Sequence, residues 1–244
     1  GTRTFHRITV AVEDAGFEIK DVIFYVHAQG FPKSHNIQKS ITKEYGKELG
    51  DKWEGYGTQL KPAYEPILVA QKPLDGTYAN NAKEHGVSGY WIDGTRIPGE
   101  PVPINKLESW SGFGEKKRPD YKQEMNTKGR YPANLIHDGS NEVLELFPEG
   151  ADRFFYCTKA SKKEKSFPVI NTHPTVKPLE LMQYLVRLTR TPNGGEVLDP
   201  FMGSGTCGVA CVREGRGFFG IDLDENYVDI AKQRIEHEIV NIDS

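Results

Sequence analysis

The last fifty residues carry the pattern that most restricts the fold. An apolar strand at 197–198 leads into the tight glycine loop 203–205, a helical stretch over 206–213 follows, and 218–221 reads as a second strand. Strand, glycine loop, helix and strand in this order form a βαβ unit, which holds a ligand at the carboxyl ends of its strands. Asp222 follows the second strand, where a carboxylate can accept hydrogen bonds from ribose hydroxyls. The pattern predicts an α/β fold with a nucleotide-type cofactor site.

The residues around the glycine loop indicate which cofactor it can hold. The string from Gly203 to Gly208 matches GxGxxG, but a pyrophosphate requires N–H donors and positive potential, and Asp199 places a carboxylate beside the turn. Two anions in a partly buried site repel each other. A ligand with an ammonium and a sulfonium, such as S-adenosylmethionine, is attracted instead. The sequence has no P-loop motif. The alternative to a cofactor site is a tight turn with a capping aspartate that binds no ligand.

The spacing of apolar residues separates the rest of the chain into regular and irregular regions. The expected elements before residue 74 are helices over 4–15 and 37–49 and strands over 22–26 and 67–70. From 74 to 150 Gly, Pro, Asn and Asp are frequent and periodicity is poor, which indicates an irregular inserted region. We therefore predict three parts: 1–73 as the N-terminal part of a sheet, 74–150 as the irregular region, and 151–244 as the cofactor-binding part.

Composition excludes several classes of protein. The 244 residues include 26 aromatics, too many for a disordered tail, and no apolar run reaches the roughly 18 residues that a membrane helix needs. Cys157, Cys207 and Cys211 form an odd set without CxxC spacing, which argues against a disulfide framework and against structural zinc. We expect a protein of the reducing cytoplasm without a membrane partner.

Charge is distributed unevenly along the sequence. Residues 196–244 hold 4 Lys and Arg against 10 Asp and Glu, whereas the remainder is mildly basic with 27 against 24. The stretch 105–130 interleaves 7 Lys and Arg with aromatic residues, and cations with rings suit nucleic acid. The candidate nucleic-acid contacts are Lys116, Lys117, Arg118, Lys159, Lys162 and Lys163. The alternative is ordinary solvated surface charge.

Several stretches together resemble a known family. The segments 171–178 (NTHPTVKP), 198–206 (LDPFMGSGT) and 220–227 (GIDLDENY), in this order, resemble S-adenosylmethionine-dependent DNA amino-methyltransferases of the circularly ordered group, whose cofactor motif lies near the C-terminus. Stretches before residue 67 are similar to phage and bacterial members. The resemblance implies an incomplete Rossmann-like methyltransferase fold, an irregular inserted target-recognition region, double-stranded DNA as partner, and a place in the cytoplasm of a bacterium or phage-infected cell.

The resemblance also assigns roles to single residues. By position, Asp199, Phe201, Gly203, Gly205 and Thr206 would line the methionine end of S-adenosylmethionine, with Ser204 in the same loop. Thr175 and Lys177 would approach the cofactor's carboxylate, and Asp222 would hold its ribose. His173 is expected to be structural rather than catalytic. An alternative for Lys177 is a solvated lysine at a helix start.

One family element is absent from the sequence. The family places a polar residue, Pro-Pro and an aromatic against the target amino group, and this sequence contains no Pro-Pro dipeptide. It contains no Pro-Cys either, which excludes the nucleophile motif of cytosine-C5 methyltransferases. We name no catalytic residue, and we expect the catalytic segment to lie before Gly1 or on a second chain.

Three functions follow as hypotheses. The first is methyl transfer from S-adenosylmethionine to the exocyclic amino group of adenine (N6) or cytosine (N4) in DNA, with this chain as an incomplete enzyme of restriction and modification. The second is a catalytically silent nucleic-acid-binding module of the same fold. The third, a dinucleotide-dependent oxidoreductase, is disfavoured by Asp199.

Overall fold

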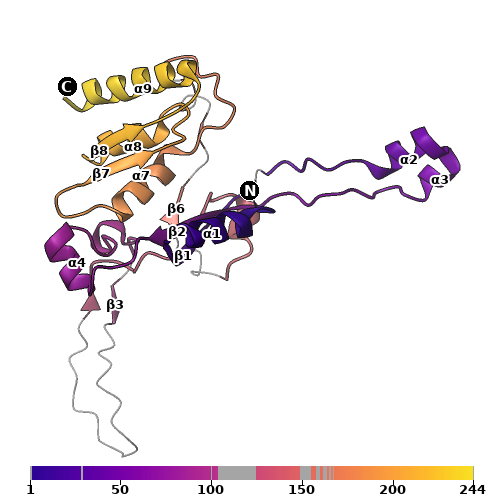
Figure 1. The fold of residues 1–244 in the computed structure, drawn as a ribbon. Helices are drawn as coiled ribbons and strands as arrows, with labels where there is room; N and C mark the ends of the chain where they lie inside the picture. Colours follow the sequence, from indigo (N-terminus) through magenta and orange to yellow (C-terminus); the bar gives the residue numbers. More distant parts are fainter. Residues whose placement is uncertain are drawn as a thin grey trace, which may run out of the picture. The chain divides into compact units, whose positions relative to one another are not determined.

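The chain divides into two compact units in a computed structural model (Figure 1). The structure describes residues 2–28, 30–99, 101–103, 125–148, 155–157, 160–161, 164, 166 and 168–243. Unit 1 comprises Gly1–Pro73 and Asn134–Asp152, and unit 2 comprises Leu74–Ala133 and Arg153–Ser244. Both units contain helices and strands, which confirms the predicted α/β class. In the described part of the chain, no helix has the length and apolarity needed to span a bilayer.

A strand pair flanked by a short third strand forms the centre of unit 1. Strand β1 (Glu18–Val26) pairs antiparallel with β2 (Tyr64–Gln71) and parallel with β5 (Leu135–His137). The predicted helix at 4–15 and strand at 22–26 are present as α1 (Phe5–Asp14) and within β1. Helix α5 (Asn141–Leu144) follows β5.

The predicted strand at 67–70 is too short, because β2 runs through Pro66, opposite Phe24. Proline cannot donate to a strand ladder and is tolerated where one side of a strand has no partner. Among the described strands β2 has only β1 as a neighbour. The proline therefore sits at a sheet edge rather than at a strand end.

A buried carboxylate ties the ends of β1 and β5 together. The Asp138 carboxylate, just after β5, accepts from the Ala28 N–H at 3.1 Å and from the Ser140 hydroxyl at 2.6 Å and N–H at 3.1 Å. Burial alone would raise the pKa of Asp138, but these hydrogen bonds outweigh it and the pKa is lowered. The carboxylate fixes the point at which the chain leaves β1.

The chain between β1 and β2 projects as a long excursion with two helices at its tip (Figure 1). The helix predicted over 37–49 is instead two helices, α2 (Ile37–Tyr45) and α3 (Lys47–Asp51). The break lies at Gly46, whose φ of 92° is not helical. The apolar spacing of four residues continued across this glycine, so periodicity alone did not reveal the break.

Unit 2 contains the remaining elements. They are α4 (Tyr78–His85), the 3-10 helix η1 (Asp93–Thr95), β3 (Val102–Pro103), β4 (Met125–Asn126), β6 (Phe155–Tyr156), α7 (Leu179–Leu188), β7 (Glu196–Asp199), α8 (Thr206–Arg213), β8 (Gly217–Gly220) and α9 (Glu225–Asp243). Strands β3 and β4 pair antiparallel, whereas β7 and β8 pair parallel. The predicted βαβ unit is therefore present as β7, α8 and β8.

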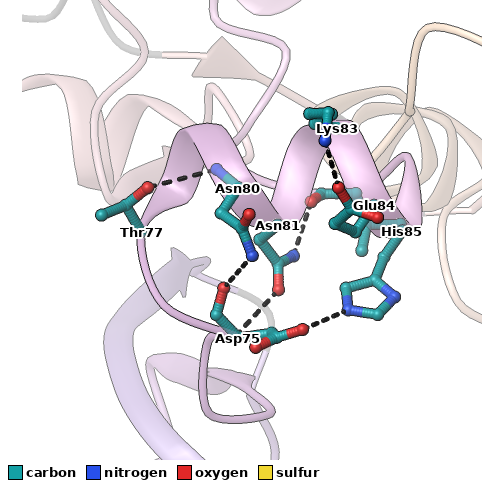
Figure 2. Close-up of polar contacts among 8 residues, drawn as sticks. Asp75, Thr77, Asn80, Asn81, Lys83, Glu84 and His85 are labelled. Atoms are coloured by element: carbon teal, nitrogen blue, oxygen red, sulfur yellow. Dashed lines mark hydrogen bonds and ion pairs between the residues drawn. The ribbon is translucent and has the colours of Figure 1, made fainter.

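Helix α4 shows that part of the predicted irregular region is regular. Figure 2 shows that polar contacts surround this helix: the Thr77 hydroxyl accepts from the Asn80 N–H at 3.2 Å, and the Asn81 amide bonds the backbone of Asp75 and Val87. His85 Nε2 lies 3.1 Å from the Asp75 carboxylate. Caps and side-chain amides hold this helix without an apolar stripe, so hydrophobic spacing could not predict it.

The core of unit 2 forms where α7, α8 and α9 cover the β7 and β8 pair. Buried Leu179, Val186, Cys207, Val209, Ala210 and Cys211 form one cluster, joined by Met182, Val197, Phe218 and Ile235. A Cβ on Gly208 would lie 2.3 Å from Ile235 Cδ1, so α8 and α9 can approach this closely only with glycine there. Buried Glu214 joins α7 to the end of α8 through Arg187, whose Nε and Nη2 donate at 2.9 and 2.6 Å. This packing fixes the loop between β7 and α8.

Candidate cofactor-binding site

A cavity of about 150 Å³ lies in unit 2 at the carboxyl end of β7. Its lining residues are His173, Thr175, Lys177, Met182, Asp199, Phe201, Met202, Gly203, Ser204, Thr206 and Cys207. The structure thus brings together Thr175, Lys177, Asp199, Phe201, Gly203, Ser204 and Thr206 from the predicted set. Gly205 and Asp222 do not line the cavity. Gly205 forms part of the glycine loop, and Asp222 accepts a hydrogen bond from it.

Backbone conformation explains the glycines of the loop. Gly203 and Gly205 have φ of 51° and 77°, the left-handed region that favours glycine. The Gly205 N–H donates to the Met202 carbonyl at 2.9 Å, and the Met202 N–H donates to the Ile221 carbonyl at 2.9 Å. These bonds close a tight turn whose end meets the first turn of α8.

Asp222 holds this turn from the neighbouring strand end. Its Oδ2 accepts from the Gly203 N–H at 2.9 Å, and its Oδ1 accepts from the Asp224 N–H at 3.0 Å. The two N–H groups, with a smaller contribution from His173, lower the pKa of Asp222. A carboxylate has about four acceptor positions, so acceptor capacity remains for a ligand hydroxyl. The ribose role stays a prediction, while the loop-holding role was not predicted.

Asp199 keeps a second carboxylate at the mouth of the cavity. Its Oδ1 accepts from the Phe201 N–H at 3.1 Å, and its carbonyl accepts from the Ile221 N–H at 2.9 Å. The side chain of Phe201 is 88% exposed beside it. The cavity lining therefore includes a negative group and an accessible ring, which suit a cationic ligand.

The segment 171–178 contributes His173, Thr175 and Lys177 to the cavity lining. His173 Nδ1 lies 2.6 Å from the Thr175 carbonyl, and the His173 ring meets the Tyr227 ring edge-on with centroids 4.6 Å apart. A Cβ on Gly203 would lie 2.7 Å from His173 Nε2, so the ring sits directly against the loop. These contacts fit the structural role expected for His173. The side chains of Thr175 and Lys177 are exposed at the rim.

Arg234 is a residue of the site that sequence reasoning missed. It is buried in α9, and its Nη1 donates to the Ser204 carbonyl at 2.6 Å, the Ser204 hydroxyl at 3.1 Å and the Thr206 hydroxyl at 3.2 Å. Burial lowers the pKa of Arg234. A sequence signal existed, because Arg234 shares a helical face with Ala231 and Ile235, where an unpaired cation would be costly. Arg234 therefore helps to hold the glycine loop through its bonds to Ser204 and Thr206.

We predict that all three cysteines of the native protein resist a thiol reagent such as DTNB at pH 8. All are buried and free, and burial raises the pKa of Cys157 to about 12. The hydrogen bond between Cys207 and Cys211 raises the pKa of Cys207 and lowers that of Cys211, whose thiol is protected by complete burial. The thiolate is the reactive form, so labelling should wait for unfolding. Three thiols per chain should react in denaturant, and rapid labelling without denaturant would contradict these environments.

Six basic residues were predicted to contact nucleic acid. Lys116, Lys117, Arg118, Lys159, Lys162 and Lys163 lie outside the described residues.

Fold and cavity together define a class of protein. A βαβ unit with carboxylates at two neighbouring strand ends beside a glycine loop suits a nucleoside-bearing cofactor that carries positive charge near the loop. A family model described as DNA methylase, for N6 and N4 methyltransferases, matches residues 1–233. The chain belongs to this DNA methylase family, as the sequence motifs predicted.

Individual relatives match different shares of the chain. The type II methyltransferase M.HindIII of Haemophilus influenzae is 26% identical over 241 residues, covering 96% of this chain and 60% of that protein. M.HpaI of Haemophilus parainfluenzae is 37% identical over 124 residues, covering 51% of this chain and 32% of that protein. A crystal structure of the M1.HpyAVI–SAM complex aligns with a TM-score of 0.47 and 22% identity, covering 96% of this chain and 71% of that chain. The chain spans between 24% and 60% of the length of these and similar curated relatives.

Proposed function

We propose that this chain is the S-adenosylmethionine-binding part of a DNA methyltransferase that modifies the exocyclic amino group of adenine (N6) or cytosine (N4). The observation that carries the proposal is the cavity at the end of β7, where Asp199 meets the glycine loop. Membership of the DNA methylase family supports the same cofactor and DNA as the substrate.

The residues of the cavity divide the work of binding. When bound, S-adenosylmethionine supplies an electrophilic methyl group on a sulfonium sulfur. Asp199 would face the positive charges of the methionine end, while Thr175 and Lys177 at the rim would hold its carboxylate. Asp222 offers its remaining acceptor positions to the ribose. Ligand pockets commonly exceed about 300 Å³, so a cavity of 150 Å³ suits one end of the cofactor.

The target amino group requires residues that we do not assign within this chain. Its lone pair is delocalised into the base, and the family's Pro-Pro-aromatic element accepts its hydrogen bonds while a ring stacks on the flipped base. The sequence has no Pro-Pro dipeptide, so we propose that another segment or a second chain supplies this element. The expected setting is the cytoplasm of a bacterial or phage-infected cell.

The second candidate is a catalytically silent DNA-binding module of the same fold. The lack of a Pro-Pro dipeptide favours it for this chain taken alone. Methyl incorporation with and without an added catalytic segment separates the two candidates.

Ligand preference tests the proposal directly. By calorimetry the chain should bind S-adenosylmethionine or S-adenosylhomocysteine and prefer both to NAD, because Asp199 repels a pyrophosphate. Asp222→Ala should weaken the adenosyl ligands by about 10- to 100-fold through lost hydroxyl contacts and a looser loop. Asp229→Ala, an exposed change on α9, is the matched control. Binding of NAD by folded protein that binds neither adenosyl ligand would refute the proposal.

A further inference from the structure

The excursion between β1 and β2, described at residues 28 and 30–63, is a projection with two helices at its tip and is named here the arm (Figure 1). Its two connecting segments are joined side by side: the Ser34 hydroxyl accepts from the Thr58 N–H at 3.0 Å and the Gln59 N–H at 3.3 Å. The Thr58 hydroxyl accepts from the His35 N–H at 3.0 Å. These bonds close the arm below its helices.

The tip of the arm is a built helical pair. Asn36 caps α2 by accepting from the Lys39 N–H at 2.9 Å. A Cβ on Gly50 would lie 2.0 Å from Thr42 Oγ1, so α3 approaches α2 as closely as glycine allows. The Trp53 and Tyr56 rings meet edge-on at 5.1 Å. The arm therefore presents its side chains from a packed helical pair.

Positive charge gathers on the outgoing half of the arm. The sequence has no acidic residue between Asp21 and Glu44, while Lys33, Lys39 and Lys43 fall in that interval and are exposed. Among the residues that the structure describes, none of these three lysines contacts a carboxylate. A group of exposed lysines without carboxylate partners is the feature that a polyanion recognises.

Exposed rings accompany these lysines. Phe31 is 82%, Tyr45 65% and Tyr56 58% exposed. Accessible aromatic side chains beside cations can stack on bases or sugars while the cations meet phosphates.

The arm also starts at the carboxyl end of the parallel strands β1 and β5. It leaves the carboxyl end of β1, next to the carboxyl end of the parallel strand β5. Open α/β sheets place their ligands outside the carboxyl ends of parallel strands. Lys72 comes just after β2 and lies near the start of β1, at the end of the strands away from the arm, because β2 is antiparallel to β1.

We propose that the arm is a DNA-contacting element that grips the phosphate backbone of the substrate duplex through Lys33, Lys39 and Lys43. The choice of DNA as the polyanion rests on the proposed function. The arm lies at a different place in the sequence from the basic stretch 105–130 that composition singled out.

The test measures binding of the full chain to a fluorescent DNA duplex over a range of salt concentrations. The variant K39Q/K43Q removes two cations from one face of α2, and its salt slope should fall by about 1.8, at 0.9 per phosphate contact. Between 50 and 200 mM salt this makes its loss of affinity about tenfold smaller than that of the parent chain. The matched control K72Q/K232Q removes two exposed lysines elsewhere and should keep the parent slope.

A second variant removes the arm itself. Replacing residues 36–57 with two glycines keeps the Ser34 and Thr58 closure, and DNA affinity should fall further while the adenosyl ligand binds as before. Unchanged DNA affinity in both variants, or an arm deletion that only turns a dimer into a monomer by sedimentation, would overturn the arm proposal. A parent chain that binds the adenosyl ligand but not DNA would overturn it too. A parent chain that binds neither would refute the proposed function instead.

Discussion

Replacing Gly205 by alanine is expected to lower the free energy of unfolding by about 2–5 kcal/mol and to abolish adenosyl-ligand binding. Gly205 has a φ of 77°, and a Cβ there would lie 2.7 Å from Ala231 Cβ and 2.9 Å from Ala231 Cα. The left-handed conformation costs a non-glycine residue about 1–2 kcal/mol, and overpacking adds about 1–3. The clash lies where α9 supports the loop, so any relief moves Gly203 and Ser204 as well.

Gly215→Ala provides the matched control at the other end of the same helix. Gly215 has a φ of 61°, but nothing lies within 4 Å of an added Cβ. The free energy of unfolding of this variant should fall only by the conformational cost of about 1–2 kcal/mol, and ligand binding should be unchanged. Urea unfolding gives both stabilities, and calorimetry at a temperature where both variants are folded gives binding. Equal losses of stability and binding in the two variants would mean that contact with Ala231 does not support the loop.

The C-terminal βαβ unit could be predicted because local signals agree there. Val197 and Phe218 begin apolar stretches, glycines stand where the turn has positive φ, and the intervening helix has an apolar face. Each signal depends on residues close in sequence. The same agreement holds for residues 22–26 of β1, whose aromatic and β-branched side chains predict a strand from the local sequence.

Elements held by polar or distant contacts could not be predicted in this way. Helix α4 depends on Thr77 and Asn81, which bond backbone groups and leave no hydrophobic period. The break between α2 and α3 depends on the conformation of one glycine and on packing between the two helices. In both cases the deciding contact is absent from the pattern of apolar residues.

The candidate site shows the same division. Asp199 and the glycine loop follow from a single local motif, and the cavity contains them. Arg234 lies 30 positions from Ser204, to which it donates, and Asp222 lies 19 positions from Gly203, from which it accepts. Only the packing of α9 and the parallel pairing of β7 with β8 bring these groups to the loop. Sequence can therefore indicate which groups face a ligand better than which groups hold them in place.

Purified alone, the chain is expected to bind S-adenosylmethionine and to transfer no measurable methyl group to DNA. The cavity can place the sulfonium end of the cofactor, whereas holding the target amino group in line requires the Pro-Pro-aromatic element, and the sequence has no Pro-Pro dipeptide. Positioning two reactants can contribute about 7–11 kcal/mol of barrier reduction. Because each 1.36 kcal/mol is about tenfold in rate, the expected loss is many orders of magnitude rather than a modest factor.

A tritium-methyl assay on duplex DNA measures this expectation. The same assay is repeated with a family segment that carries the Pro-Pro-aromatic element, fused before Gly1 or added as a separate fragment. Transfer should appear only with the segment, and changing its aromatic residue to alanine should remove transfer while S-adenosylmethionine still binds. Cofactor binding and base positioning would then reside in different stretches of polypeptide. Multiple turnovers by the 244-residue chain alone, in protein free of any other methyltransferase, would contradict the prediction and assign base positioning to residues already within it.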